Sequence, residues 1–186
     1  MSDFESNIKA KADLIAARMK THRRRLESGD NTKLIEWIIP GKLGCAQRPL
    51  RHHPRYAGGG SGEVLPRELS DLVITWANQI KSEGVSSVIT FMHARDLGCY
   101  GELELPGGNL NALMKEVGLY VRPLPWEDPA HSKTDKAAKD AKLKEMRSAA
   151  LRAYDELARP VLLMCSAAID RSAPAAAFIW YHRMTS

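Results

Sequence analysis

Apolar residues in the first thirty positions recur at helical spacing between charged residues. The members of this pattern are Phe4, Ile8, Ile15, Met19 and Leu26. Such spacing predicts an amphipathic helix, and the run Gly29-Asp30-Asn31 is expected to end it. The sequence therefore predicts an N-terminal amphipathic helix over residues 1–31, which extends a main domain over residues 32–186.

After residue 34, short apolar runs alternate with helical periods. The runs predict strands over residues 35–39, 42–46, 85–92, 119–124 and 161–164. One predicted helix ends at Gly84 and buries Leu69, Leu72, Val73, Trp76 and Ile80. Three further helices are predicted over residues 110–118, about 134–158 and 173–183. Strands that alternate with helices indicate an α/β fold, in which helices flank a central, mostly parallel sheet.

One predicted strand end carries a pair of reactive side chains. The strand over residues 161–164 runs into Cys165, and Arg171 follows six positions later, just before the last predicted helix. In parallel sheets, ligands bind at the carboxyl ends of the strands. A loop at this place can aim backbone N–H groups at its centre, and the helix N-terminus adds positive potential. The sequence therefore predicts a cradle for a tetrahedral oxyanion such as phosphate, sulfate or vanadate.

The side chains of this loop suit phosphoryl chemistry. Arg171 can offer a planar, permanently charged fork to two oxygens. The same potential would favour the thiolate of Cys165, and Ser172 can donate its hydroxyl to the sulfur. The Cys-x5-Arg spacing alone is not specific, because Cys45 and Arg51 share it. Since Cys45 is followed by a proline-containing loop and not by a helix, we expect the site at Cys165.

Composition and charge limit the class of protein to which the chain can belong. The chain has 186 residues, of which 44% are hydrophobic and 26% charged, as expected for one globular domain. Its net charge of +5 favours anionic partners without identifying one. No apolar run approaches the ~18 to 20 residues that cross a bilayer, and the N-terminus lacks the apolar stretch of a signal peptide. With three cysteines and no paired CxxC motif, we expect a cytoplasmic protein without disulfides, membrane span, metal or cofactor.

The segment MCSAAIDRS resembles the signature loop of the cysteine-dependent protein tyrosine and dual-specificity phosphatases. GKLGCAQRP is similar to the opening strands of the dual-specificity members. Residues 84–129 are similar to their middle, particularly in the branch related to kinase-associated phosphatase and its bacterial relatives. Within this stretch, Trp126-Glu127-Asp128 resembles the mobile Trp-Pro-Asp loop of the family. The resemblance covers residues 34 to 183 and implies a protein tyrosine phosphatase-like fold.

The resemblance also implies a role for each residue of the site. Cys165 would attack phosphorus and form a cysteinyl-phosphate, and Asp128 would act first as acid and then as base. The phosphate oxygens would be bound by Arg171 and by the loop residues Ser166, Ala167, Ala168, Ile169 and Asp170. Trp126 could border the substrate as a stacking platform or could equally be a hinge or packing residue, and no metal is required. Glu127, Asp135 and Asp170 are alternative acids that the sequence leaves open.

Two departures from the family pattern keep a second function open. Met164 stands where the family usually has histidine, and Ala168 where it usually has glycine. The chain could therefore be a module that binds phosphorylated partners without hydrolysing them. The positive charge would also suit a phosphatase for phosphoinositides or RNA 5′-phosphates.

The remaining motifs favour ordinary interpretations. The run Arg23-Arg24-Arg25 is interpreted as a solvated helix end, because no aromatic residues alternate with it, and nucleic acid is not the expected partner. His52-His53 and the glycine-rich run at residues 58–62 are interpreted as a loop. The expected partner is a phosphorylated protein or another phosphomonoester.

Overall fold

The structure, a computed structural model, describes residues 3–53 and 63–184 of the chain. Its strands are β1 (Glu36–Ile39), β2 (Leu43–Gln47), β3 (Ser87–Thr90), β4 (Tyr120–Pro123) and β5 (Val161–Cys165). Its α-helices are α1 (Asp3–Glu27), α2 (Ser70–Ser82), α3 (Ala94–Gly98), α4 (Leu110–Glu116), α5 (Lys136–Glu156) and α6 (Ser172–Met184). Two short 3-10 helices, η1 (Arg67–Leu69) and η2 (Pro106–Gly108), precede α2 and α4.

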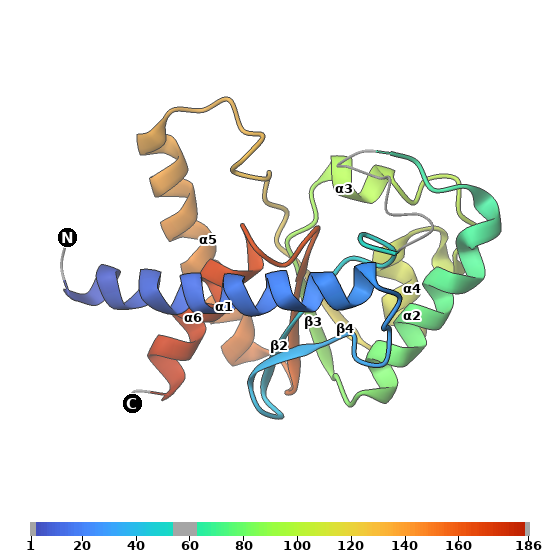
Figure 1. The fold of residues 1–186 in the computed structure, drawn as a ribbon, viewed down its shortest axis with the longest axis horizontal. Coiled ribbons are helices and arrows are strands. Elements are labelled where there is room, and N and C mark those ends of the chain that lie inside the picture. Colours follow the sequence, from blue (N-terminus) through green and yellow to red (C-terminus); the bar gives the residue numbers. More distant parts are fainter. Residues whose placement is uncertain (1–2, 54–62, 185–186) are drawn as a thin grey trace.

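The strands form one sheet in the order β1-β2-β5-β3-β4 (Figure 1). β2, β5, β3 and β4 are parallel, and only β1 runs antiparallel to its neighbour β2. Gly41 lies in the turn between β1 and β2 with φ +63°, a conformation that favours glycine. The parallel order brings the ends of β2 and β5 together, because Gln47 pairs with Cys165.

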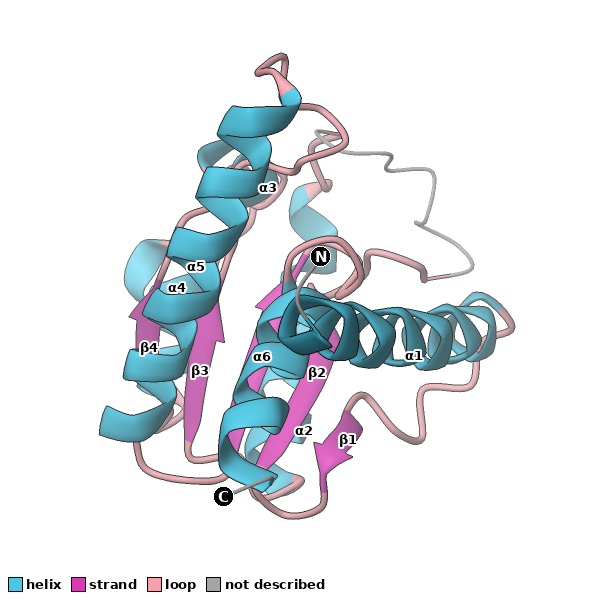
Figure 2. Ribbon diagram, turned by 90° about the vertical axis from the view of Figure 1, so that its left-hand side faces the viewer, coloured by secondary structure: helices cyan, strands magenta, loops and turns pink. Residues whose placement is uncertain are grey.

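Helices cover both faces of the sheet (Figure 2). α1, α5 and α6 lie on one face, and α2 and α4 lie on the other. Neighbouring strand residues alternate between the two cores. Ile89 and Leu163 belong to the first hydrophobic cluster, whereas Val88 and Leu162 belong to the second. The predicted α/β fold with a mostly parallel sheet and flanking helices is therefore confirmed.

Helix α1 packs into the first of these cores. Ile8, Ile15 and Met19 are buried in the same cluster as residues of β5 and α6. The guanidinium of buried Arg147 in α5 also donates a 3.1 Å hydrogen bond to the Glu5 carboxylate. Among the described helices, none is long and apolar enough to cross a membrane.

The glycine signals at helix ends agree with the prediction, whereas one buried position, the length of one strand and one short helix differ from it. Gly84 and Gly118 end α2 and α4 as predicted, each with a positive φ. Leu72, predicted to be buried, is 41% exposed, because α2 turns this side chain toward solvent. β3 is shorter than the predicted strand 85–92, and α3 was not predicted, since five residues are too few for a helical period to stand out.

Candidate active site

The segment from Cys165 to Ser172 connects the buried strand β5 to helix α6, as the sequence predicts. The backbone N–H of Arg48, which follows β2, anchors its beginning with hydrogen bonds to the carbonyls of Cys165 (3.0 Å) and Ser166 (3.2 Å). Ala168 adopts φ +59°, so an alanine holds the left-handed turn that the resemblance assigns to glycine. Such a conformation costs a residue with a Cβ about 1–2 kcal/mol.

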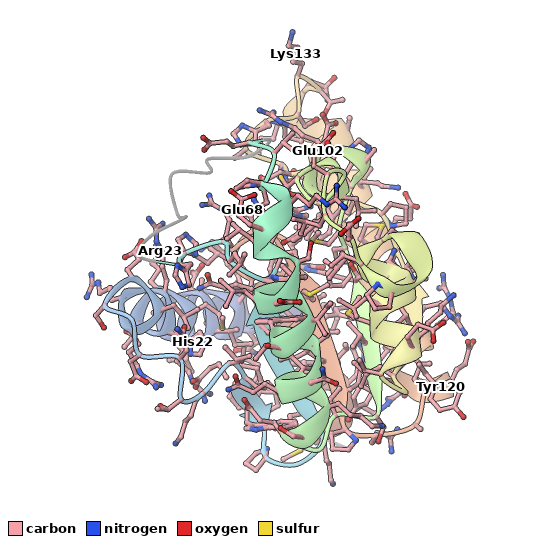
Figure 3. The ribbon with its side chains drawn as sticks, turned by 90° about the vertical axis from the view of Figure 1, so that its right-hand side faces the viewer. His22, Arg23, Glu68, Glu102, Tyr120 and Lys133 are labelled. Atoms are coloured by element: carbon pink, nitrogen blue, oxygen red, sulfur yellow. The ribbon has the colours of Figure 1, made fainter. Side chains whose placement is uncertain are left out.

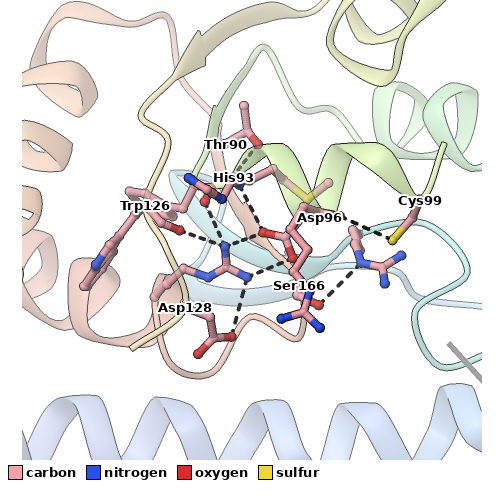
Figure 4. A network of polar contacts seen from close by, with 12 residues as sticks. Thr90, His93, Asp96, Cys99, Trp126, Asp128 and Ser166 are labelled. Atoms are coloured by element: carbon pink, nitrogen blue, oxygen red, sulfur yellow. Dashed lines mark hydrogen bonds and ion pairs between the residues drawn. The ribbon is translucent and has the colours of Figure 1, made fainter. Parts of the chain in front are cut away.

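Arg171 is fully buried, and other parts of the chain fix its guanidinium (Figure 4). Its Nη1 donates to the carbonyls of Phe91 and Trp126, each at 3.0 Å, and to Asp96 Oδ2 at 2.5 Å. Its Nη2 donates to Asp96 Oδ1 at 3.3 Å. Nε is also buried but has no partner among the described residues. The fork is thus held through its two terminal nitrogens, while Nε keeps an unused N–H.

The charges around Arg171 favour its ionised form. Burial alone would lower the pKa of the guanidinium, but nearby Cys165, Asp96 and Asp128 raise it, and Cys165 contributes most among these charges. For Asp96, burial would raise the pKa, yet the bonds to Arg171 hold it below its ordinary value. A charged Arg171–Asp96 pair therefore lies close enough to Cys165 for the two sites to interact electrostatically.

A capping interaction orients Asp96. Asp96 is the third residue of α3, and its Oδ2 accepts a 3.0 Å hydrogen bond from the backbone N–H of His93, the N-cap residue. This is the reciprocal contact of a capping box. The Asp96 carboxylate is therefore oriented by the start of its own helix as well as by Arg171. Sequence reasoning missed Asp96; the available signal was its position three residues after the N-cap, just beyond β3.

Asp128 is the candidate acid that reaches Arg171. Its Oδ2 lies 3.7 Å from Arg171 Nη2, and its Oδ1 accepts a 2.9 Å hydrogen bond from the backbone N–H of Ala130. The side chain remains 23% exposed, and a cavity of about 130 Å³ lies beside it, lined also by His93, Asp96 and His131. Asp128 is thus both near the cradle and open to solvent.

The other candidate acids are placed differently. Asp135 is the N-cap of α5 and accepts a 2.8 Å hydrogen bond from the backbone N–H of Ala138. Glu127 and Asp170 are exposed. Among the described ion pairs, neither Glu127, Asp135 nor Asp170 pairs with Arg171, whereas Asp128 does.

Neither the hydroxyl of Ser172 nor the ring of Trp126 is hydrogen-bonded to the Cys165 sulfur or the Arg171 side chain. The hydroxyl of Ser172 is buried without a partner among the described residues, so it does not donate to the Cys165 sulfur. The side chain of Trp126 is buried and packs edge-on against Phe91, with the ring centroids 6.1 Å apart. Its indole points away from the guanidinium, so its contribution to the site is the backbone carbonyl that Arg171 binds (Figure 4). The ring therefore packs in the core, which is one of the roles that the sequence left open for Trp126.

The competing pair Cys45 and Arg51 does not form a second cradle. Cys45 lies buried within β2. Its burial, and to a smaller extent the neighbouring Cys165, raises the pKa of its thiol. Arg51 instead reaches the loop of residues 165–171, called the Cys165 loop below, where its Nε donates a 3.1 Å hydrogen bond to Ser166 Oγ. Sequence reasoning did not assign Arg51 to this loop, because the contact depends on β2 lying next to β5.

The described residues contain no group of three or more His, Cys, Asp or Glu side chains that could hold a metal ion. His52 is hydrogen-bonded through Nδ1 to Gln47, and the run at residues 58–62 lies outside the described residues. No family model, curated protein or solved structure matches the chain. The function is therefore argued from the geometry of the site.

Proposed function

We propose that the protein is a phosphomonoester hydrolase of the protein tyrosine or dual-specificity phosphatase type, with the fold of that family. The observation that carries the proposal is the fixed guanidinium of Arg171. Two backbone carbonyls and Asp96 hold it within the electrostatic influence of Cys165, while its buried Nε has no partner among the described residues. A buried N–H without a partner costs about 1–3 kcal/mol, and an oxyanion bound in the loop would satisfy it.

The proposed reaction has two steps. In the first, the Cys165 thiolate attacks phosphorus, an S–P bond forms and the P–O ester bond breaks. Asp128 gives its proton to the leaving oxygen. In the second, Asp128 takes a proton from water, the water oxygen attacks phosphorus, and the S–P bond breaks. Inorganic phosphate leaves, and the thiolate is restored.

The contacts of Arg171 and Asp128 support the catalytic role proposed for each of them. Arg171 and the backbone N–H groups of residues 166–171 would stabilise the charge of the equatorial oxygens in the transition state. Since Asp96 and two carbonyls already fix the guanidinium, little reorganisation is needed when that charge develops. Asp128 would exchange protons with both leaving group and water, and its partial exposure near Arg171 supports this role.

The second candidate is a module that binds phosphorylated partners without hydrolysing them. The nucleophile is 1% exposed, and the Ser172 hydroxyl that should assist it makes no contact with its sulfur. Either feature would slow attack while leaving the anion cradle intact. Phosphoinositides and RNA 5′-phosphates are further substrate classes, and a substrate panel distinguishes them from phosphoproteins.

Turnover of para-nitrophenyl phosphate in the presence of a chelator tests the proposal. We expect hydrolysis without added metal and its loss in Cys165→Ser, which should still bind vanadate. Cys45→Ser is the matched control and should remain active. If the parent protein binds vanadate but releases no phosphate, the binding module is the better account.

A further inference from the structure

A second pocket, of about 140 Å³, lies next to the Cys165 loop, between α1, α2 and the segment that follows β2. We call it the β2–α2 pocket. Apolar side chains form most of its wall, namely Leu26, Leu34, Leu50, Leu72 and Trp76. Its polar side includes Gln47, Arg48, Arg51 and His52. Figure 3 views the molecule from the α2 side and shows Arg23 projecting from α1.

Two arginines connect this pocket to the Cys165 loop. The Nε atoms of Arg48 and Arg51 both donate to Ser166 Oγ, at 3.4 and 3.1 Å. Arg48 is buried and also donates from Nη1 to the Tyr100 hydroxyl at 3.2 Å. A ligand in the pocket would therefore meet the same guanidinium groups that contact the first residue after Cys165.

The arginines of the pocket lack a direct carboxylate partner within the described part of the chain, although the charge of Asp96 reaches both of them. Neither Arg48 nor Arg51 forms an ion pair there, and no described carboxylate lines the pocket. Burial, and then the charges of Arg48 and Arg23, lower the pKa of Arg51. An anion bound between these side chains would relieve that repulsion.

Two further polar groups of the pocket lack partners. Gln47 and His52 are both more than nine-tenths buried and are hydrogen-bonded to each other. Gln47 Nε2 and His52 Nε2 have no hydrogen-bond partner among the described residues. Because His52 Nδ1 donates to Gln47 Oε1, Nε2 of its neutral ring is an acceptor, and of the two atoms only Gln47 Nε2 can donate to an anion. Native proteins rarely leave a buried N–H unsatisfied, so Gln47 Nε2 points to a ligand that binds here.

We propose that the β2–α2 pocket binds the carboxylate of a glutamate that lies close in sequence to the phosphorylated residue of a protein substrate. The arginine forks suit the two carboxylate oxygens, and the apolar wall suits the hydrocarbon stem that carries them. A second phosphate group is polar on every side and would place oxygens against Leu26, Leu72 or Trp76. The inference rests on the proposed function, because it takes the phosphate of the substrate to bind in the Cys165 loop, but it does not require hydrolysis of that phosphate.

Binding of matched phosphotyrosine peptides tests the inference. Each pair of peptides differs only by Glu or Gln at one of the three positions on either side of the phosphotyrosine. Calorimetry on the full chain carrying Cys165→Ser gives both affinities. At low salt, we expect at least one Glu peptide to bind about 10-fold tighter than its Gln partner, as for one charge-assisted hydrogen bond.

A substitution at the rim locates the subsite. Leu72→Glu should abolish the preference for the Glu peptide by charge repulsion, and Leu72→Gln should keep it. Leu72 is exposed at the mouth of the pocket and lies outside the phosphate loop, so both variants should still fold.

The outcomes separate the subsite from the proposed function. Equal affinities for all pairs, or a preference that survives Leu72→Glu, would each overturn the subsite. No binding of any peptide would instead reject the phosphate site of the proposed function, and this inference with it. Tighter binding of a peptide with phosphoserine in place of the glutamate would replace the carboxylate by a second phosphate and overturn the assignment. A Glu preference in a chain that releases no phosphate would support the subsite and reject the hydrolase.

Discussion

Four hydrogen bonds hold the guanidinium of Arg171 through its two terminal nitrogens. Nη1 is shared among two carbonyls and a carboxylate oxygen, and Nη2 reaches the second oxygen of the same carboxylate. The planar fork of arginine makes this set of contacts possible. An ammonium group has one nitrogen and cannot reach Asp96, the two carbonyls and a bound oxyanion together.

Arg171→Lys should therefore lower kcat/KM on an aryl phosphate by at least ~100-fold, or about 2.7 kcal/mol of transition-state stabilisation. The charge is kept, so the loss reports the geometry of the fork. Arg67→Lys, in an exposed ion pair with Glu104, serves as the control and should leave kcat/KM unchanged. Near-normal kinetics of Arg171→Lys would remove the fork from the mechanism.

Asp128→Asn should lower kcat by ~10²- to 10⁴-fold on phosphotyrosine, the usual contribution of general-acid catalysis. With para-nitrophenyl phosphate the loss should be smaller, because its activated phenolate leaves with less need of a proton. Steady-state kinetics on the two substrates measures this difference.

Asp135→Asn is the matched control for the general acid. Asparagine caps helices as well as aspartate does, so α5 should keep its N-cap and the variant its stability. We expect unchanged kcat on both substrates. If Asp135→Asn shows the leaving-group dependence and Asp128→Asn does not, the acid is on another part of this loop.

Helix α1 offers a comparison between adjacent residues of opposite burial. Ile15 is fully buried in the core shared with β5 and α6, whereas Leu14 is 52% exposed. Ile15→Ala should destabilise the protein by about 2–5 kcal/mol, because it leaves a cavity between α1 and the rest of the core. Leu14→Ala should stay within ~0.5 kcal/mol of the parent. Urea unfolding of both variants measures the difference; equal effects would show that α1 does not belong to the cooperative core.

Elements with a long or strongly alternating pattern could be predicted from the sequence. α1, α5 and α6 and the strands around Val88 and Leu162 follow from spacing alone. The loop between Cys165 and Arg171 was also predicted, since it follows a buried strand and precedes a helix. α3 could not be predicted, and Asp96 was missed with it, because a five-residue helix has no period to recognise.

Contacts between segments that are distant along the chain could not be predicted from sequence patterns. Arg48 and Arg51 approach Ser166 because β2 lies beside β5, although more than 110 residues separate them along the chain. Local spacing predicts strands but does not fix their order in the sheet. The same limit applies to Trp126, whose burial against Phe91 depends on how the segment after β4 returns to the end of β3.

Taken as a whole, the molecule assembles its site from four segments at one edge of the sheet. Arg48 and Arg51 follow β2, Asp96 follows β3, Asp128 follows β4 and the Cys165 loop follows β5. Every parallel strand thus contributes a group, as expected where carboxyl ends of strands converge. Unfolding of the sheet should therefore disperse the site completely, and stability and activity should be lost together.

Stability should fall as the pH drops from about 6.5 toward 4. Burial and then the Arg25 charge lower the pKa of His22, and burial and then Arg51 and Arg23 lower that of His52 to about 4. Since both pKa values are below the unfolded value, the unfolded chain binds more protons in this range, and acid favours unfolding. The stabilisation is complete above pH 6.5 and declines below it. Urea unfolding between pH 7.5 and 5 measures the slope, which should be shallower in His22→Leu; a parent protein equally stable at pH 7 and 5 would contradict this account.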